Sequence, residues 1–172
     1  EAIPLFEDVK TDRGLYFLGR CYEATGQYIL AIQRYRQAQR RFPDSPLAED
    51  IAFSIADAFY NSGQDRIARR SYKGFIEENP ESRHVPVALY KLACIAYRES
   101  AYNDCIRQVE DLVEAHPEAD ICAEADYLAG LSFMALDRPS NAIFSFTEVF
   151  KRHPENPVAS AALHKIVYAY TA

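Results

Sequence analysis

Apolar and small residues recur along the chain at helical spacing, in stretches separated by turn residues. Ala31, Tyr35 and Ala38, for example, stand at positions i, i+4 and i+7, which places them on one face of a helix. Polar and charged residues fill the positions between them. No segment shows the sustained alternation of apolar and polar residues that is typical of hairpin strands. The pattern therefore predicts an all-α protein.

The helical stretches repeat with a period of 37 residues. Four prolines keep that spacing: Pro43, Pro80, Pro117 and Pro154. Small residues stand twelve positions before each proline: Ala31, Ala68, Cys105 and Ala142. Small residues also stand twenty-four positions before it: Gly19, Ala56, Ala93 and Gly130. A small residue on one helix that faces a small residue on the next lets two backbones approach closely. Each repeat is therefore predicted to be a pair of packed helices.

Turn residues separate the two helices of each repeat, at Gly26, Gly63, Ser100 and Asp137. The first, or A, helices are predicted near residues 12–25, 45–61, 83–99, 119–136 and 156–171. The second, or B, helices are predicted near residues 28–41, 65–78, 102–115 and 139–152. Ser45-Pro46 and Asn156-Pro157 should each open an A helix, with an N-cap followed by proline at the first helical position. Pro86 should lie in the first turn of another A helix.

The repeat period predicts a single solenoid that spans the chain. Its predicted parts are a partial repeat with a B helix (1–10), four repeats (11–43, 44–80, 81–117 and 118–154) and a partial repeat with an A helix (155–172). Both ends interrupt a repeat, and the last helix carries the apolar residues Leu163, Ile166, Val167 and Tyr170. Because solenoids need polar capping elements, we expect a section of a longer solenoid, or ends that pair in an oligomer. The alternative is that the last helix caps the stack.

The first complete repeat carries a known consensus. Its residues are Leu18-Gly19, Tyr22, Gly26, Ala31, Tyr35, Ala38 and Pro43. This pattern resembles the tetratricopeptide repeat family, and the resemblance implies a right-handed α-solenoid of helix-turn-helix repeats. The departure from the family is the period, 37 residues instead of about 34. The loop at 42–48 also resembles loops of bacterial cell-envelope members, such as the Tol-Pal-associated coordinator and the outer-membrane-assembly lipoprotein.

The resemblance implies a concave groove that is lined by the A helices and binds protein. The groove residues that it implies are Tyr16, Arg20, Asp50, Phe53, Asp57, Tyr60, Tyr90, Tyr97, Arg98, Glu124, Tyr127, Leu131 and His164, with Arg13, Glu23, Asn61, Val87, Cys94, Met134 and Tyr168 beside them. The lysine and asparagine set with which some members clamp a C-terminal carboxylate is missing. The groove charge is mixed, so a guest of either sign remains open.

One column of rings stands out without any knowledge of the family. Its members are spaced by the repeat length: Tyr16, Phe53, Tyr90, Tyr127 and His164. A ladder of rings in a groove would offer contact area at low entropy cost and polar tips for hydrogen bonds to a peptide backbone. The alternative is that these rings pack between adjacent A helices.

Composition and charge exclude several other functions. A net charge of −6 argues against nucleic acid, and no apolar stretch is long enough for a membrane span. The four cysteines, Cys21, Cys94, Cys105 and Cys122, form no Cys-x-x-Cys pair and lack histidines at zinc-finger spacing. We expect no metal and no cofactor, and the cysteines are treated as small core residues whose disulfide state stays open. His84, near Arg83 and Pro86, is expected to have a capping or surface role.

No nucleophile motif, phosphate-binding loop or carboxylate pair indicates catalysis, so the chain is not expected to be an enzyme. The sequence instead predicts a module that binds a peptide or protein in the groove. The alternative function is architectural, in which the ends and the convex face build a multiprotein or self-associated assembly. The loops favour the bacterial periplasm or cell envelope, with the cytoplasm as the alternative. The sequence does not name the partner.

Overall fold

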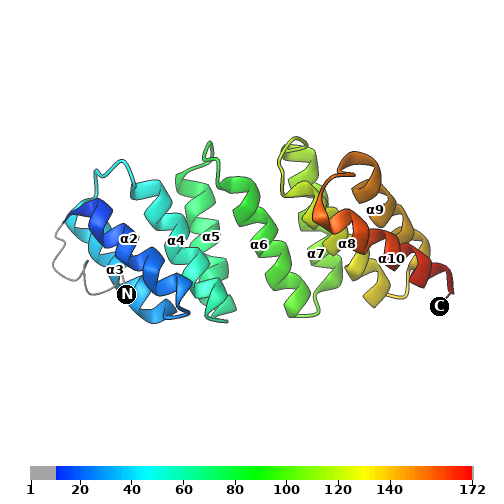
Figure 1. Ribbon diagram of the computed structural model, residues 1–172, viewed down its shortest axis with the longest axis horizontal. Coiled ribbons are helices and arrows are strands. Elements are labelled where there is room, and N and C mark those ends of the chain that lie inside the picture. The colour runs from blue at the N-terminus through cyan, green and yellow to red at the C-terminus, as the bar shows by residue number, and fades with distance from the viewer. Residues whose placement is uncertain (1–10, 172) are drawn as a thin grey trace. The chain divides into compact units, whose positions relative to one another are not determined.

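The computed structural model describes residues 11–171, and over that range it contains nine α-helices and no strand (Figure 1). The helices are α2 (Asp12–Ala24), α3 (Tyr28–Arg41), α4 (Ala48–Asn61), α5 (Asp65–Glu78), α6 (Val85–Arg98), α7 (Tyr102–Ala115), α8 (Cys122–Ala135), α9 (Pro139–Arg152) and α10 (Pro157–Thr171). The even-numbered helices are the predicted A helices and α3, α5, α7 and α9 are the predicted B helices. The B helix predicted at 1–10 lies outside the described residues.

The four B helices have the predicted bounds, whereas α4, α6 and α8 begin two or three residues later than predicted. The expectation that Ser45 is the N-cap of α4 is wrong. The Ser45 Oγ accepts the N–H of Leu47 at 3.1 Å and so forms a turn, and the helix begins only at Ala48. Asn156 does act as predicted, because its Oδ1 accepts the N–H of Val158 at 2.8 Å and α10 begins with Pro157.

All four predicted turn residues adopt the left-handed backbone region. Their φ angles are 72° for Gly26, 76° for Gly63, 61° for Ser100 and 56° for Asp137. After α2, the N–H of Gly26 binds the carbonyl of Glu23 at 2.9 Å and the N–H of Gln27 binds that of Tyr22 at 2.8 Å. These two bonds define a Schellman motif, which ends a helix and satisfies its last carbonyl groups. Glycine favours that conformation, while Ser100 and Asp137 adopt it at a cost in backbone strain.

The described residues form two compact units, one up to Val85 and one from Pro86 onward. In the first unit, α3 packs against α2 and α4, and α4 packs against α5. In the second unit, α8 packs against α7 and α9, and α10 packs against α9 and α8. One apolar cluster of this unit joins α6, α7 and α8 through residues such as Ala93, Val109 and Leu128. Another joins α8, α9 and α10 through residues such as Ala123, Phe146 and Ala162.

Side chains in the loops before the A helices bind the A helix of the preceding repeat. The hydroxyl groups of Ser45 and Ser82 donate to the carboxylates of Asp12 and Glu49, each at 2.5 Å. Both pairs are 33 residues apart, so the contact repeats with the fold. The next residue in that loop position is Ala119, which has no donor on its side chain. The loops of the first unit are therefore fixed by polar contacts that repeat from one hairpin to the next.

Two of the small residues of the A helices, Gly19 and Gly130, face rings on the B helices. A Cβ built on Gly19 would lie 2.3 Å from Cε1 of Tyr35, and one built on Gly130 would lie 2.4 Å from Cε1 of Phe146. Both rings have an exposed fraction of 0%. At Gly19 and Gly130 the partner is thus a large ring, and not a second small residue as the sequence pattern had indicated. The glycine provides the space that the ring fills.

This contact predicts that glycine-to-alanine changes at the ring contacts and at an open helix position have opposite effects on stability. Gly19→Ala and Gly130→Ala should lower the free energy of unfolding by about 1–3 kcal/mol, because a fully buried ring must move. Gly74→Ala in α5 is the matched control, since a Cβ there meets no atom within 4 Å. That change should raise the free energy of unfolding by up to about 1 kcal/mol through helix propensity. Urea denaturation followed by circular dichroism measures all three, and equal effects would contradict the proposed contact.

Candidate protein-binding site

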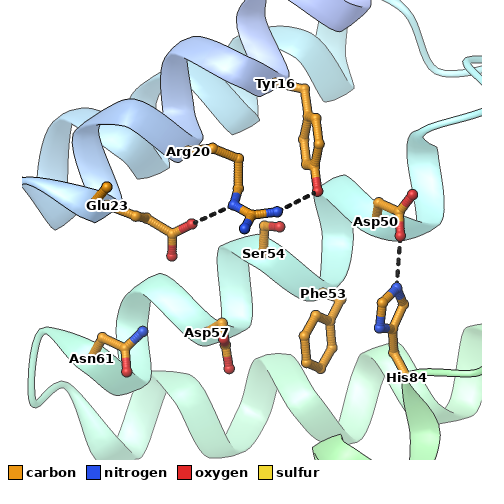
Figure 2. A pocket seen from close by; sticks show the side chains of 10 residues that line it. Tyr16, Arg20, Glu23, Asp50, Phe53, Ser54, Asp57, Asn61 and His84 are labelled. Atoms are coloured by element: carbon orange, nitrogen blue, oxygen red, sulfur yellow. Dashed lines mark hydrogen bonds and ion pairs between the residues drawn. The ribbon is translucent and has the colours of Figure 1, made fainter.

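A pocket of about 410 Å³ opens on the first unit between α2, α4 and the residue before α6 (Figure 2). The residues that line it are Tyr16, Arg20, Glu23, Ala24, Asp50, Phe53, Ser54, Asp57, Asn61 and His84. On α2, Tyr16, Arg20 and Glu23 follow one another at helical spacing and so share one face. Residues on α4 share a face in the same way. The pocket therefore forms where corresponding faces of two A helices lie beside each other.

The aromatic residues of the pocket rest on rings of the B helices. The ring of Tyr16 lies 5.9 Å from that of Tyr35, and the ring of Phe53 lies 6.1 Å from that of Tyr72. In the second unit, Tyr127 rests on Phe146 in the same way, with 5.4 Å between ring centroids. These three rings thus pack within their own hairpins. Tyr16, Phe53 and Tyr127 are nevertheless only partly buried. These packing partners lie on the B helices and not, as the alternative interpretation had it, on adjacent A helices, and the role of the rings in binding stays a prediction.

Two buried tyrosines of the B helices hold two carboxylates of the pocket. The hydroxyl of Tyr35 donates to Oε2 of Glu23 at 2.5 Å, and the hydroxyl of Tyr72 donates to Oδ1 of Asp57 at 2.6 Å. Burial raises the pKa of Glu23, the bond from Tyr35 opposes that rise, and the negative charge of Asp57 adds to it. Burial and the bond to Glu23 likewise raise the pKa of Tyr35. The core therefore fixes the position of acidic groups on the surface.

Arg20 is the cation at the centre of the pocket (Figure 2). Its Nη1 donates to the hydroxyl of Tyr16 at 3.2 Å, and its Nε lies 3.9 Å from Oε2 of Glu23. The guanidinium also lies 6.0 Å from the centroid of the Tyr16 ring. Three weak contacts thus keep the side chain beside Tyr16 and Glu23.

Asp50 and His84 close one end of the pocket. Oδ1 of Asp50 lies 2.6 Å from Nε2 of His84 and 2.9 Å from Nη2 of Arg83. The His84 ring also stacks on Phe53, with 4.5 Å between centroids and 11° between planes. The bond from His84, and then the bond and charge of Arg83, hold the pKa of Asp50 below its usual value. This cluster fixes the loop before α6 to the first turn of α4.

Five of the predicted groove residues, Tyr16, Arg20, Asp50, Phe53 and Asp57, line this pocket, and so do Glu23 and Asn61. Tyr60 is instead buried, with its ring 6.4 Å from that of Tyr72. In the second unit, Tyr90, Tyr97, Tyr127 and Leu131 are partly buried against the apolar clusters. Arg98 and His164 are exposed. Glu124 accepts a hydrogen bond from the amide of Asn156 at 3.4 Å. Nδ1 of His164 lies 2.8 Å from the carbonyl oxygen of Ser160 on the same helix. Their role in binding stays a prediction.

Three residues of the pocket were not predicted from the sequence: Ala24, Ser54 and His84. Ser54 is buried, with an exposed fraction of 7%. Its equivalent positions in the other repeats hold residues of unrelated types, so the sequence pattern gives no signal there. His84 did carry a signal, because the corresponding positions hold apolar residues: Leu47, Ile121 and Val158. A polar residue in an otherwise apolar column indicates a local contact that the other repeats lack. Here that contact is the bond to Asp50.

The sequence matches a tetratricopeptide repeat family over residues 124–156, which together with the helical hairpins makes the chain a tetratricopeptide repeat protein. Over residues 9–95, half of the chain, it matches the YfiO family, which is described as an outer membrane lipoprotein. The chain belongs to this family of outer membrane lipoproteins. A search of curated proteins gave no significant match.

Solved structures of tetratricopeptide repeat proteins resemble the chain. The TPR-like repeats of a putative kinesin light chain from Podosopora anserina are 16% identical, with a TM-score of 0.71 over 95% of this chain and 88% of that one. A tetratricopeptide repeat protein from Parabacteroides merdae is 16% identical, with a TM-score of 0.73 over 95% and 61%. YrrB, a TPR protein with an unusual peptide-binding site, is 17% identical, with a TM-score of 0.68 over 95% and 82%.

These likenesses confirm the predicted fold class, an all-α solenoid of tetratricopeptide-like repeats. Repeats of this class are protein-interaction modules and are generally not catalytic. Among the described helices, none combines the length and apolar character needed to cross a membrane.

The contacts of Asp50 predict a stability difference that depends on pH. Asp50→Asn should lower the free energy of unfolding by about 1 kcal/mol at pH 7, because it replaces a charged acceptor of two hydrogen bonds. The pKa of folded Asp50 lies below its value of about 3.9 in the unfolded chain. The stabilisation is therefore fully present above pH 4 and is lost as the pH falls through the folded pKa. Urea denaturation between pH 7 and pH 3 should show the two proteins converge, whereas exposed Asp44→Asn should match the wild type throughout.

Proposed function

We propose that the protein is a non-catalytic interaction module whose A helices bind a peptide or protein segment, with the pocket of the first unit as part of the binding surface. The observation that carries this proposal is the pocket of about 410 Å³, whose walls come from corresponding faces of α2 and α4. It contains five of the residues that the repeat resemblance assigns to the groove. It also contains partly exposed rings and polar groups within a few ångströms of one another.

The pocket suits an extended segment. Tyr16 and Phe53 offer apolar area with few rotatable bonds, so little side-chain entropy is lost on binding. The exposed amide of Asn61 can donate to and accept from a peptide backbone. Because Tyr35 and Tyr72 already hold Glu23 and Asp57 in place, fewer groups must be ordered when a guest binds.

The corresponding positions of the second unit have a different chemistry. The column of Arg20 and Asp57 continues with Cys94 and Leu131, and the column of Glu23 continues through Tyr60 with Tyr97 and Met134. These second-unit residues are partly buried and pack against the two apolar clusters. The first unit therefore suits polar groups of a guest, and the second unit suits apolar side chains.

The family match supports a particular cellular setting for the proposed binding. Membership of a family of outer membrane lipoproteins supports a location in the bacterial cell envelope, with the cytoplasm as the alternative. In that setting the guest would be another envelope protein or an unfolded segment of one.

An architectural role is the second candidate, and the surface of α10 favours it. Large apolar side chains of this helix are exposed: Leu163 at 43%, Val167 at 66%, Tyr168 at 60% and Tyr170 at 74%. Exposed apolar side chains that gather on one element are typical of protein contacts. Self-association or assembly with another protein would cover them.

The binding proposal predicts that the ring column is needed for affinity. Peptides selected by display against the full chain should bind at least tenfold more weakly to Phe53→Ala and Tyr127→Ala, because each change removes contact area from an A helix. Phe144→Ala is the matched control, since this ring lies on the B helix α9 and is 66% exposed. Its affinity should stay within twofold of the wild type by calorimetry. Circular dichroism separates lost binding from lost folding, and binding that survives in the folded ring variants would refute the groove.

The architectural role predicts association through α10. Light scattering on the wild type should give a mass that rises with protein concentration, and Leu163→Glu with Tyr170→Glu should keep the mass at that of the monomer. Phe144→Glu serves as the control, because it adds a charge at an equally exposed ring on another helix. A wild type that stays monomeric at high concentration would count against self-association.

A further inference from the structure

The charges of the first-unit pocket are not balanced. Three carboxylates line it, and Asp50 is already paired with Arg83 and His84. Arg20, the one arginine or lysine among the lining residues, lies beside Glu23. Asp57 has no ion pair within the part of the chain that the structure describes, and its hydrogen bond comes from the neutral hydroxyl of Tyr72. One carboxylate of the pocket therefore lacks a cation.

A serine side chain lies one helical turn from this carboxylate. Ser54 lines the pocket one turn before Asp57 on α4, and its exposed fraction is only 7% (Figure 2). Its hydroxyl lies on the pocket-lining face of α4 and can accept a hydrogen bond from a guest. Asn61, one turn after Asp57, adds an exposed amide on the same face. A serine hydroxyl and a carboxylate without an ion pair thus line the same pocket.

The negative charges of Asp57 and Glu23 destabilise each other in this pocket. Asp57 raises the pKa of Glu23, so the two carboxylates repel each other in a site that is partly shielded from water. A cation between them would remove that repulsion. The rings of Tyr16 and Phe53 also line the pocket, and ring faces attract ammonium and guanidinium groups. Over the described residues, no three His, Cys, Asp or Glu side chains come together as metal ligands, so the geometry favours an organic cation.

We infer that this pocket takes a cationic side chain of the bound segment, a lysine ammonium or an arginine guanidinium, and that Asp57 and Ser54 accept its hydrogen bonds. The inference rests on the proposed function and adds the charge of the guest, which the mixed charges of the sequence left open. The hydroxyl of Tyr72 occupies Oδ1 of Asp57, which leaves Oδ2 for the guest. Arg20 then remains with Tyr16 and Glu23.

Single amino-acid probes test this without knowledge of the natural partner. The full chain, labelled with nitrogen-15, is titrated with N-acetyl-arginine methylamide and with N-acetyl-citrulline methylamide, which has the same shape without the charge. The arginine probe should shift the amide signals of Ser54, Asp57 and Asn61 in a saturable way, and citrulline should bind at least tenfold more weakly. N-acetyl-lysine methylamide shows which of the two cations the pocket prefers.

Two variants localise the effect. Asp57→Asn should abolish the preference for arginine over citrulline, while its amide oxygen can still accept the bond from Tyr72. Asp44→Asn removes the same charge from an exposed position of the same unit and should keep the preference. Raising the salt concentration from 50 to 500 mM should weaken binding of the arginine probe to the wild type, because the attraction is electrostatic.

Equal binding of arginine and citrulline would overturn the inference, and so would a preference for arginine that survives in Asp57→Asn. The same inference fails if a displayed peptide that requires Phe53 binds equally well after its arginines and lysines are replaced by citrulline and glutamine. That last result would leave the proposed function intact. Conversely, if no displayed peptide required the ring column, the proposed function would fail while the single-residue titration still decided the charge of the pocket.

Discussion

The contact between a small residue of an A helix and a buried ring of its B helix underlies the rest of the structure. At Gly19 and Gly130 the approach is so close that a single added methyl group would overlap the ring. The ring can therefore fill the space between the two helices completely, and it has no exposed surface. Interior packing of this density fixes the angle and distance between helices, because small changes of volume cannot be absorbed. The positions of the residues on the surface of the hairpin are therefore fixed by the same packing.

The same buried rings connect the core to the pocket. Tyr35 and Tyr72 are fully buried, yet their hydroxyl groups reach Glu23 and Asp57 at the surface. A phenylalanine would fill the core equally well, as Phe146 does in the second unit. The tyrosine hydroxyl groups of the first unit therefore act at the surface, where they hold two carboxylates in place and give this unit a polar site. Where the second unit has Val109 and Phe146 in place of these tyrosines, the positions that correspond to Glu23 and Asp57 hold Tyr97, Met134, Cys94 and Leu131.

The repeat made most of the fold predictable from the sequence. The prolines and small residues gave the helix order and the bounds of all four B helices, because the same packing requirement recurs every 37 residues. The starts of α4, α6 and α8 were less predictable, since a loop side chain such as Ser45 can form a turn before the helix as easily as it can cap it. The site was predictable only in part. A comparison of equivalent repeat positions identifies residues that occupy the same place in every repeat, such as Tyr16 and Phe53. It does not identify His84, because the role of His84 depends on a single contact with Asp50.

The size rule in the hairpins has a consequence for the outer surface of α10. The position that is Gly19, Ala56, Ala93 and Gly130 in the earlier A helices is occupied by Val167. A β-branched side chain there takes the volume that a tyrosine or phenylalanine would need. Any helix that packs against α10 in the manner of a B helix must therefore have a small side chain at the facing position. The A helix would then supply the large residue and the B helix the small one, the reverse of the arrangement at Gly19 and Gly130. Steric fit alone would make this surface selective among otherwise similar helices.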